Sequence, residues 1–289
     1  MDGGGMALVL VLMVIAIITA LVVEFAYGVY INTSSLANWQ AGQRLSLASR
    51  SAVRLAAKTI AEKAEGRKYT YPGFIELSYE NPLEAGGAVL IRAEDENSKF
   101  NINTVIYPNG KLNKEAYDSL MRLLGALELD PGIAGRVADW IDPDSEPRLT
   151  DSEDEAKNAP LNSVDEILLI RSIDREAYAK LQPYITIYGS GAININGADV
   201  LVLMSLSEGI DREMAGRVVG YRDVTRFESP GEISKVAGFE GDLGIYLMGK
   251  ITVKGSVFRI ISTAVSGDIK RTIEAVVDLG EVVKYWKET

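Results

Sequence analysis

Two reactive residue types are missing from this 289-residue chain, which contains neither cysteine nor histidine. Without cysteine there can be no disulfide and no thiolate nucleophile. Without histidine the chain lacks the commonest general base, the usual zinc ligand and the central member of a Ser-His-Asp triad. We therefore expect that the protein is not an enzyme. A pair of carboxylates of the kind that cleaves glycosidic bonds is the alternative left open.

Positive charge is also scarce. Thirty basic residues stand against 40 acidic ones, which gives a net charge of -10. An acidic chain repels the phosphates of nucleic acids and suits soluble surfaces or the binding of cations. Hydrophobic residues make up 47% of the chain and charged residues 24%, which is ordinary for a folded protein. The length allows one large or two medium cores.

The most informative feature that is present is an uncharged apolar run, residues 6–23. At about 1.5 Å per residue it makes a helix about 27 Å long, which reaches across the hydrocarbon core of a bilayer. A secretory signal peptide has its small-residue cleavage site after the apolar run. Here the small-residue junction comes before the run, between Gly5 and Met6. We therefore expect residues 1–5 to be a leader and residues 6–27 to cross the membrane.

The helix is expected to continue beyond the membrane. Apolar or small residues recur at helical spacing, and charged residues fall largely between them. This pattern predicts one helix from about residue 6 to about residue 65, with its second part lying on a globular head. The alternative is a break at Gly28 and the polar residues 32–35. The predicted contact face consists of Leu36, Trp39, Leu45, Ala48, Ala52, Leu55 and Thr59.

Short β-like runs are predicted on both sides of a helical middle, residues 99–248. Their β-branched and aromatic residues are separated by glycine- and proline-containing turns, and residues 266–268 have the composition of a hairpin turn. The chain is therefore expected to be of the α+β class. The predicted strands cover residues 68–71, 74–79, 88–93, 184–188, 250–254, 257–265 and 272–278.

The helical middle contains echoes of itself, which indicate two related modules. Helix starts are marked by serines three residues before a glutamate and by capping aspartates. Short, closely spaced helices of this kind are typical of helix-hairpin-helix modules. The predicted helix starts are Ser163, Asp174, Asp211 and Ser229. The repeated segments are Asn-Ile-Asn at 101–103 and 194–196, Ala-Gly-Arg-Val at 134–137 and 215–218, and Ile-Asp-Arg-Glu at 173–176 and 210–213.

The most acidic stretch, residues 139–155, carries eight carboxylates and one arginine. Such density raises the free energy of the folded loop unless solvent or a cation offsets the repulsion. Counted from Asp142, oxygen-bearing side chains fall at positions one, three, five, nine and twelve, the spacing of an EF-hand loop. Pro147 occupies position six, where that loop needs glycine, so we reject a true EF-hand. We predict a hard-cation site that takes calcium, and a solvated acidic loop is the alternative.

With these motifs the chain resembles the minor pseudopilin K family of type II secretion systems. The acidic Asp-Trp-Ile-Asp stretch followed by Glu-Asp is the most specific part of the resemblance. The resemblance implies a pilin-like long N-terminal helix on a small antiparallel sheet, with a large helical insertion of helix-hairpin-helix (SAM-like) modules. The matching segments are Gly5 with 6–13, 101–103, 139–144, 153–154, 160–166, 181–185 and the terminal strands.

The resemblance also implies a location and partners. It implies a single-pass inner-membrane precursor of a Gram-negative bacterium, cut by the prepilin peptidase after Gly5 and methylated on Met6. The periplasmic head would stand at the tip of the pseudopilus and help initiate or cap its assembly for protein export across the outer membrane. Its expected partners are the minor pseudopilins I and J, with secreted substrates as further candidates and no nucleic acid. The implied cofactor is structural calcium, with Asp142, Asp144, Glu153 and Asp154 as first candidate ligands and Asp139 and Glu146 as secondary ones.

Leu10 stands where most members of the wider pilin family carry glutamate, at the fifth position after the predicted cleavage site. A carboxylate in lipid is costly without a partner. A subunit with no neighbouring subunit above it avoids this cost if it carries leucine, so Leu10 predicts a terminal position. Residues 1–5 contain no lysine or arginine, whereas the leaders of this family normally do.

A rival interpretation comes from DNA-uptake receptors, whose helix-hairpin-helix domains the paired modules also resemble. Those domains bind phosphate through glycine-rich hairpins flanked by lysine. Here the corresponding hairpins, residues 129–133 and 208–212, carry acids. A membrane-anchored DNA-binding protein is therefore the alternative function. Our expected division of the chain is a leader at 1–5, a membrane segment at 6–27, the first part of the pilin-like domain at 28–98, modules at 99–185 and 186–248, and terminal strands at 249–289.

Overall fold

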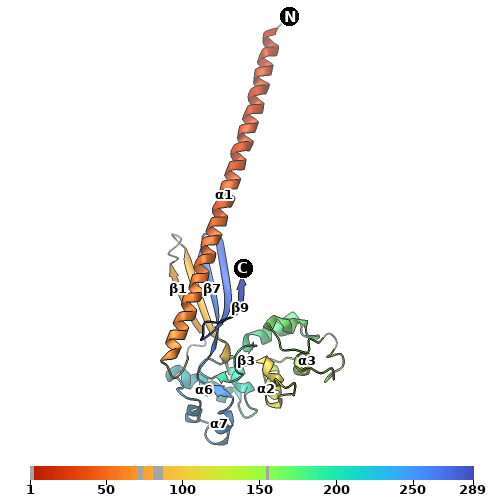
Figure 1. Cartoon of the computed structure of the whole chain (residues 1–289), viewed down its shortest axis with the longest axis vertical. Helices are drawn as coiled ribbons and strands as arrows, with labels where there is room; N and C mark the ends of the chain where they lie inside the picture. Colours follow the sequence, from red (N-terminus) through yellow and green to blue (C-terminus); the bar gives the residue numbers. More distant parts are fainter. Residues whose placement is uncertain (1–2, 71–73, 81–86, 154–155) are drawn as a thin grey trace.

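The computed structural model describes residues 3–70, 74–80, 87–153 and 156–289. Its first element, α1 (Gly3–Glu65), is one unbroken helix of 63 residues, about 95 Å long. It projects far beyond the head (Figure 1). The predicted single helix is confirmed, and the break considered at Gly28 and residues 32–35 is absent. Within this continuous helix, the hydroxyl of Thr33 donates to the carbonyl of Val29 at 2.8 Å, one turn earlier.

Only the second part of α1 packs on the head. The first buried residue among those described is Gly42, and the buried stripe continues through Leu45, Ala48 and Ala52. The head can therefore be prepared without the membrane segment.

Three members of the predicted contact face are exposed instead, and this part of the prediction was wrong. Leu36 and Trp39 precede the head, and Leu55 is 59% exposed on the side away from the sheet. Their places in the contact are taken by Ser49, Val53 and Ala57. Small residues let the helix approach the sheet closely, a constraint that hydrophobic spacing does not reveal.

A five-stranded antiparallel sheet, ordered β1-β2-β7-β8-β9, lies beside α1. Alternate residues of its central strands, such as Ile91, Ile260 and Ile273, form one core with the helix. The predicted hairpin between β7 and β8 is confirmed and turns at Gly267, whose φ is +54°. The strands are β1 (Phe74–Glu80), β2 (Ala88–Asp95), β7 (Val257–Ser266), β8 (Ile269–Asp278) and β9 (Val283–Glu288).

Not every predicted strand belongs to this sheet. Residues 68–70 are not a strand, although the amide of Thr70 donates to the carbonyl of Val253 at 2.9 Å. The runs at 184–188 and 250–254 shrink to two residues each and pair within the helical region. The edge strand β9 was missed because its residues are mostly exposed and form no apolar run.

The helical region is a single insertion, because β2 and β7 are neighbours in the sheet although residues 96–256 separate them. It contains two modules, each closed by a short parallel pair between its own first and last strands. Both lie at the end of the sheet that is far from the N-terminus of α1 (Figure 1). The first module comprises η1 (Glu96–Ser98), β3 (Phe100–Asn101), η2 (Ile102–Val105), α2 (Lys114–Ala126), α3 (Gly132–Ile141), η3 (Val164–Leu169), α4 (Arg175–Leu181), η4 (Gln182–Tyr184) and β4 (Ile185–Thr186). The second comprises β5 (Ile193–Asn194), α5 (Val200–Ser205), α6 (Arg212–Val224), η5 (Pro230–Lys235), α7 (Asp242–Leu247) and β6 (Ile251–Thr252).

The second asparagine of each Asn-Ile-Asn segment makes the same pair of backbone hydrogen bonds in its module. Asn103 donates to the carbonyl of Leu161 at 3.0 Å and accepts from its amide at 2.9 Å. Asn196 makes the same pair of bonds to Phe227, at 2.9 and 3.0 Å. Each asparagine thus fixes the backbone that leads into a 3₁₀ helix, which confirms that the modules are related.

The Ile-Asp-Arg-Glu echo, by contrast, is not a structural equivalence. Asp174 caps α4, where its carboxylate accepts from the amide of Ala177 at 2.8 Å. Asp211 caps α6, where it accepts from the amide of Met214 at 2.8 Å. Since α6 shares its Ala-Gly-Arg-Val segment with α3, the two aspartates cap different members of the repeat.

A buried polar joint connects the sheet to both modules. Asp95, at the end of β2, accepts from the amide of Asn97 at 2.8 Å and from the side chain of Asn194, in the second module, at 2.6 Å. A Cβ on Gly255 would lie 2.2 Å from the Asp95 carboxylate, so only glycine fits beside it. The neighbouring Glu96 is fully buried and bonds Arg259 at 2.8 Å and Lys99 at 3.0 Å.

The two carboxylates of this joint differ in their titration. Burial raises the pKa of Asp95 to about 6, and the neighbouring Glu96 adds to the rise, although the hydrogen bonds from Asn194 and Asn97 oppose it. Burial alone would also raise the pKa of Glu96, but Lys99 and Arg259 hold it below its usual value. Asp95 is therefore the member of the joint that takes up a proton near neutral pH.

We expect the folded head to gain stability relative to Asp95→Asn as the pH falls from 7 to 5. The folded carboxylate binds its proton at about pH 6, whereas the ordinary pKa is 3.8, so protons favour the folded state in this window. The expected gain is about 1 kcal/mol, measured by urea unfolding at the two pH values. Asp268→Asn, at an exposed position in the hairpin turn, is the control and should show no such difference. Parallel pH profiles for wild type and Asp95→Asn would contradict the prediction.

Candidate cation site

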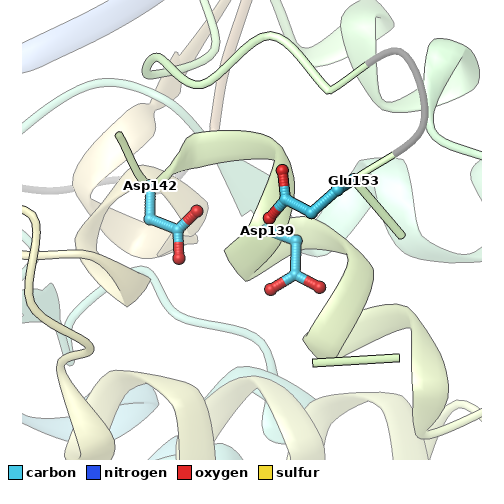
Figure 2. A group of neighbouring side chains, drawn as sticks. All are labelled: Asp139, Asp142 and Glu153. Carbon is cyan, nitrogen blue, oxygen red and sulfur yellow. The ribbon is translucent and has the colours of Figure 1, made fainter. Parts of the chain in front are cut away.

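The last turn of α3 and the loop that follows it bring three carboxylates together. Asp139 and Asp142 stand three residues apart on the helix end and are both fully buried, and Glu153 returns from the loop to meet them. One oxygen of each lies within 4.8 Å of the other two. Figure 2 shows the three side chains grouped around one space.

Asp139 is occupied by hydrogen bonds from the loop itself. Its Oδ2 accepts from the backbone amide of Arg148 at 2.8 Å and from the hydroxyl of Ser152. Its Oδ1 accepts from the Nη1 of Arg148, and the same Nη1 reaches Oδ2 of Asp142. Asp139 thus anchors the loop to α3 and has little capacity left for another ligand.

Two other oxygens of the group have no donor. Asp142 Oδ1 and Glu153 Oε1 are buried and without a hydrogen-bond partner in the part of the chain that the structure describes. Burial raises the pKa of both carboxyls, and for Glu153 the nearby Asp139 and Asp142 add to the shift. Buried acceptors are rarely left unpaired in native proteins. The site therefore offers hard oxygen ligands, which suit a cation such as calcium.

The other candidate ligands lie elsewhere. Asp144 and Glu146 are exposed, and Asp144 Oδ1 accepts from the amide of Glu146 at 2.9 Å to form a local turn. Asp154 lies outside the described residues. The linear spacing of an EF-hand thus brings its first and twelfth positions together but leaves the third and fifth in solvent. Arg148 and Ser152 were missed, although Arg148 stood out as the single base of an acidic stretch.

The residues expected at the membrane end lie on the exposed first turns of α1. Gly5, Met6 and Leu10 touch no other part of the described chain, and Met6 is 73% exposed. The helix is long and apolar enough to cross a membrane. These positions suit a membrane anchor, and their processing and terminal role stay predictions.

In the two hairpins of the rival DNA-binding interpretation, aspartate side chains accept hydrogen bonds from the backbone amides. In the first hairpin, Asp130 accepts from the amide of Gly132 at 2.9 Å. In the second, Asp211 binds the amide of Met214 at the start of α6. A bound phosphate would need these amides as donors, but they already donate to aspartates, whose negative charge would repel it.

A long N-terminal helix that is apolar at its free end and packed on an antiparallel sheet at the other defines a pilin-like protein, here enlarged by a helical insertion. Two family models described as type II secretion system protein K match residues 98–190 and 193–254, which together make up more than half of the chain. The chain therefore belongs to the type II secretion system protein K family. The DNA-uptake alternative finds no support in these matches.

Curated relatives carry the same description. A type II secretion system protein K of Pseudomonas aeruginosa is 28% identical over 169 residues, which cover 53% of this chain and 50% of the relative. The corresponding protein of Pectobacterium carotovorum is 24% identical over 66% of this chain and 65% of its own length. The chain thus spans between half and two thirds of the length of these relatives.

A solved structure shares the fold. A chain in the crystal structure of the GspK-GspI-GspJ complex from the type 2 secretion system of enterotoxigenic Escherichia coli aligns with a TM-score of 0.68. The alignment covers 89% of this chain and 99% of that chain at 19% sequence identity. At this identity the likeness establishes the α+β fold, whereas the SAM-like detail of the modules stays a prediction.

We expect Asp139→Asn to destabilise the head strongly. The substitution removes the negative charge that holds Arg148 and Ser152, and breaking a buried charge pair typically costs about 3 kcal/mol. Urea unfolding in the presence of a chelator measures the change without any contribution from bound ions. The matched control is Asp144→Asn, which changes an exposed carboxylate of the same loop and should cost less than about 0.5 kcal/mol. Equal losses in the two variants would contradict the anchoring role of Asp139.

Proposed function

We propose that this protein is a minor pseudopilin at the tip of the type II secretion pseudopilus, where it helps initiate or cap assembly for protein export across the outer membrane. Membership of the protein K family is the observation that carries the proposal. Its role is assembly and not catalysis, in keeping with a family named as a component of a secretion system.

In this proposal the first part of α1 anchors the protein in the inner membrane. The prepilin peptidase cuts after Gly5, Met6 becomes the methylated N-terminus, and the head stands in the periplasm. The apolar first part of the helix supports this arrangement, because none of its described side chains is buried by the head. Leu10 supports a terminal position, since it places no carboxylate in lipid that a subunit above would have to neutralise.

The proposed partners are minor pseudopilins of types I and J, the components that accompany GspK in the enterotoxigenic Escherichia coli complex. The stretch of α1 between the membrane segment and the head supports contacts of this kind. Residues 28–41 carry no charge, and Tyr30 and Trp39 are 67% and 62% exposed. Large apolar side chains gathered outside a membrane mark surfaces that other chains cover. We assign this stretch of α1, residues 28–41, to contacts with neighbouring subunits.

A co-purification experiment tests the assignment. The head from residue 32 onward, which retains Trp39, should form a stable ternary complex with the heads of types I and J on size exclusion. We expect Trp39→Ser to weaken the complex at least about tenfold, because buried tryptophans are common hot spots of interfaces. The control is Leu169→Ser, which removes another exposed apolar side chain, 66% exposed, from the first module. Failure to bind either partner would contradict the proposed function, and equal effects of the two variants would contradict only the assigned surface.

We also propose that the acidic loop binds calcium as a structural ion. The unpartnered oxygens of Asp142 and Glu153 support this choice, and Asp154 is a further candidate ligand from the sequence. The ion would supply the positive charge that three converging carboxylates lack and would hold the loop on α3. Asp139 would position the loop, and Asp144 and Glu146 would stay in solvent.

Removal of calcium should lower the melting temperature of the head by about 5–10 °C. This is the shift expected when a ligand at about 100 times its Kd stabilises a domain of this size by about 2.7 kcal/mol. Differential scanning calorimetry with and without chelator measures it, and elemental analysis counts the bound ion. Asp142→Asn and Glu153→Gln should abolish the response, whereas Asp144→Asn should retain it. An unchanged melting temperature together with no bound metal would leave only a solvated acidic loop.

A further inference from the structure

Arg148 is the only basic residue in the acidic stretch 139–155, and it lies inside the carboxylate group. Its side chain is 28% exposed, while Asp139 and Asp142 are fully buried. One nitrogen, Nη1, reaches a carboxylate oxygen of each. The guanidinium thus joins two acids that would otherwise repel each other at the end of α3.

The negative charges of this group are only partly neutralised. Asp139, Asp142 and Glu153 bring three negative charges when ionised, and Arg148 returns one positive charge. The remainder, two negative charges, corresponds to one divalent cation. Without Arg148 the same group would hold three uncompensated charges in a largely buried space, at a high cost in free energy.

The carboxylate oxygens of the group also fall into two sets, those that Arg148 and Ser152 bind and those without a partner. Arg148 and Ser152 occupy both oxygens of Asp139 and one oxygen of Asp142. Asp142 Oδ1 and Glu153 Oε1 are left without a partner among the described residues. An ion can therefore bind to different oxygens from those that the guanidinium holds. The two cations would then lie close together, and each would weaken the binding of the other.

We infer that Arg148 is a tethered counter-cation that keeps the loop folded when no ion is bound and lowers the affinity of the site for a divalent ion. This inference rests on the proposed calcium site. It assigns a regulatory consequence to one side chain: the loop responds to the concentration of free calcium instead of staying loaded. A purely structural arginine would stabilise the ion-free and ion-bound head equally.

The test compares Arg148→Gln with wild type in both states of the head. Melting temperatures are measured in chelator and in saturating calcium chloride, and the calcium Kd is measured by calorimetric titration. We expect Arg148→Gln to lower the melting temperature mainly in chelator and to tighten the calcium Kd about tenfold, because a nearby positive charge has been removed. The matched control is Arg171→Gln, which alters an exposed arginine 3.6 Å from Asp151 in the same loop region and should change the Kd less than about twofold.

The outcomes separate the two proposals. If wild type binds no calcium, the proposed site and this inference both fail. If wild type binds calcium but Arg148→Gln loses the same number of degrees in both states, or keeps the wild-type Kd, only the inference is overturned. A second variant, Arg148→Ala, covers a folding defect, since saturating calcium should restore a head that lacks the tethered charge. Failure of both variants to fold in saturating calcium would also overturn the inference.

Discussion

The architecture of the head depends on the burial of two adjacent carboxylates where the sheet meets its insertion. Asp95 ends β2 and Glu96 begins η1, and both modules reach back to them through Asn194 and Thr186. Apolar packing has no direction and would tolerate several orientations of the modules on the sheet. A buried charge tolerates few, because each rearrangement would leave it without donors. The long insertion is therefore held in one orientation by polar chemistry, while the three apolar cores supply the bulk of the stability.

The candidate cation site differs from this joint in how many of its buried oxygens have hydrogen-bond donors. At the joint, both oxygens of Asp95 and of Glu96 have donors, and Lys99 and Arg259, which also bind Glu94 and Glu274, hold Glu96. At the end of α3, one arginine binds two of the three carboxylates, and Asp142 Oδ1 and Glu153 Oε1 have no partner among the described residues. A structural network is complete without help, whereas an incomplete one indicates a missing partner. The unpaired oxygens of the second group support the proposal of an ion there.

The sequence predicted the elements that carry a strong local signal. The long helix, the hairpin at Gly267 and the Asn-Ile-Asn repeats followed from periodicity, turn chemistry and self-similarity. What could not be predicted depends on distant contacts. Leu55 has the right spacing for the contact face, but the sheet touches the small residues beside it. Asp144 has the right spacing for a ligand, but the path of its loop leaves it in solvent. The role of Asp139 depends on Arg148 and Ser152, which reach it only after the loop has closed.

The N-terminal helix is the part of the structure that bears most directly on the proposed role in assembly. Between the membrane segment and the head, α1 exposes large apolar side chains such as Tyr30 and Trp39, and exposed apolar surface outside a membrane favours association. In the proposed assembly, neighbouring subunits would cover this surface. Leu10 places no carboxylate in the apolar run, which agrees with the proposed terminal position. The candidate cation site lies in the first module, away from this stretch of α1, so the proposed ion would order the loop after α3 without contacting the helix.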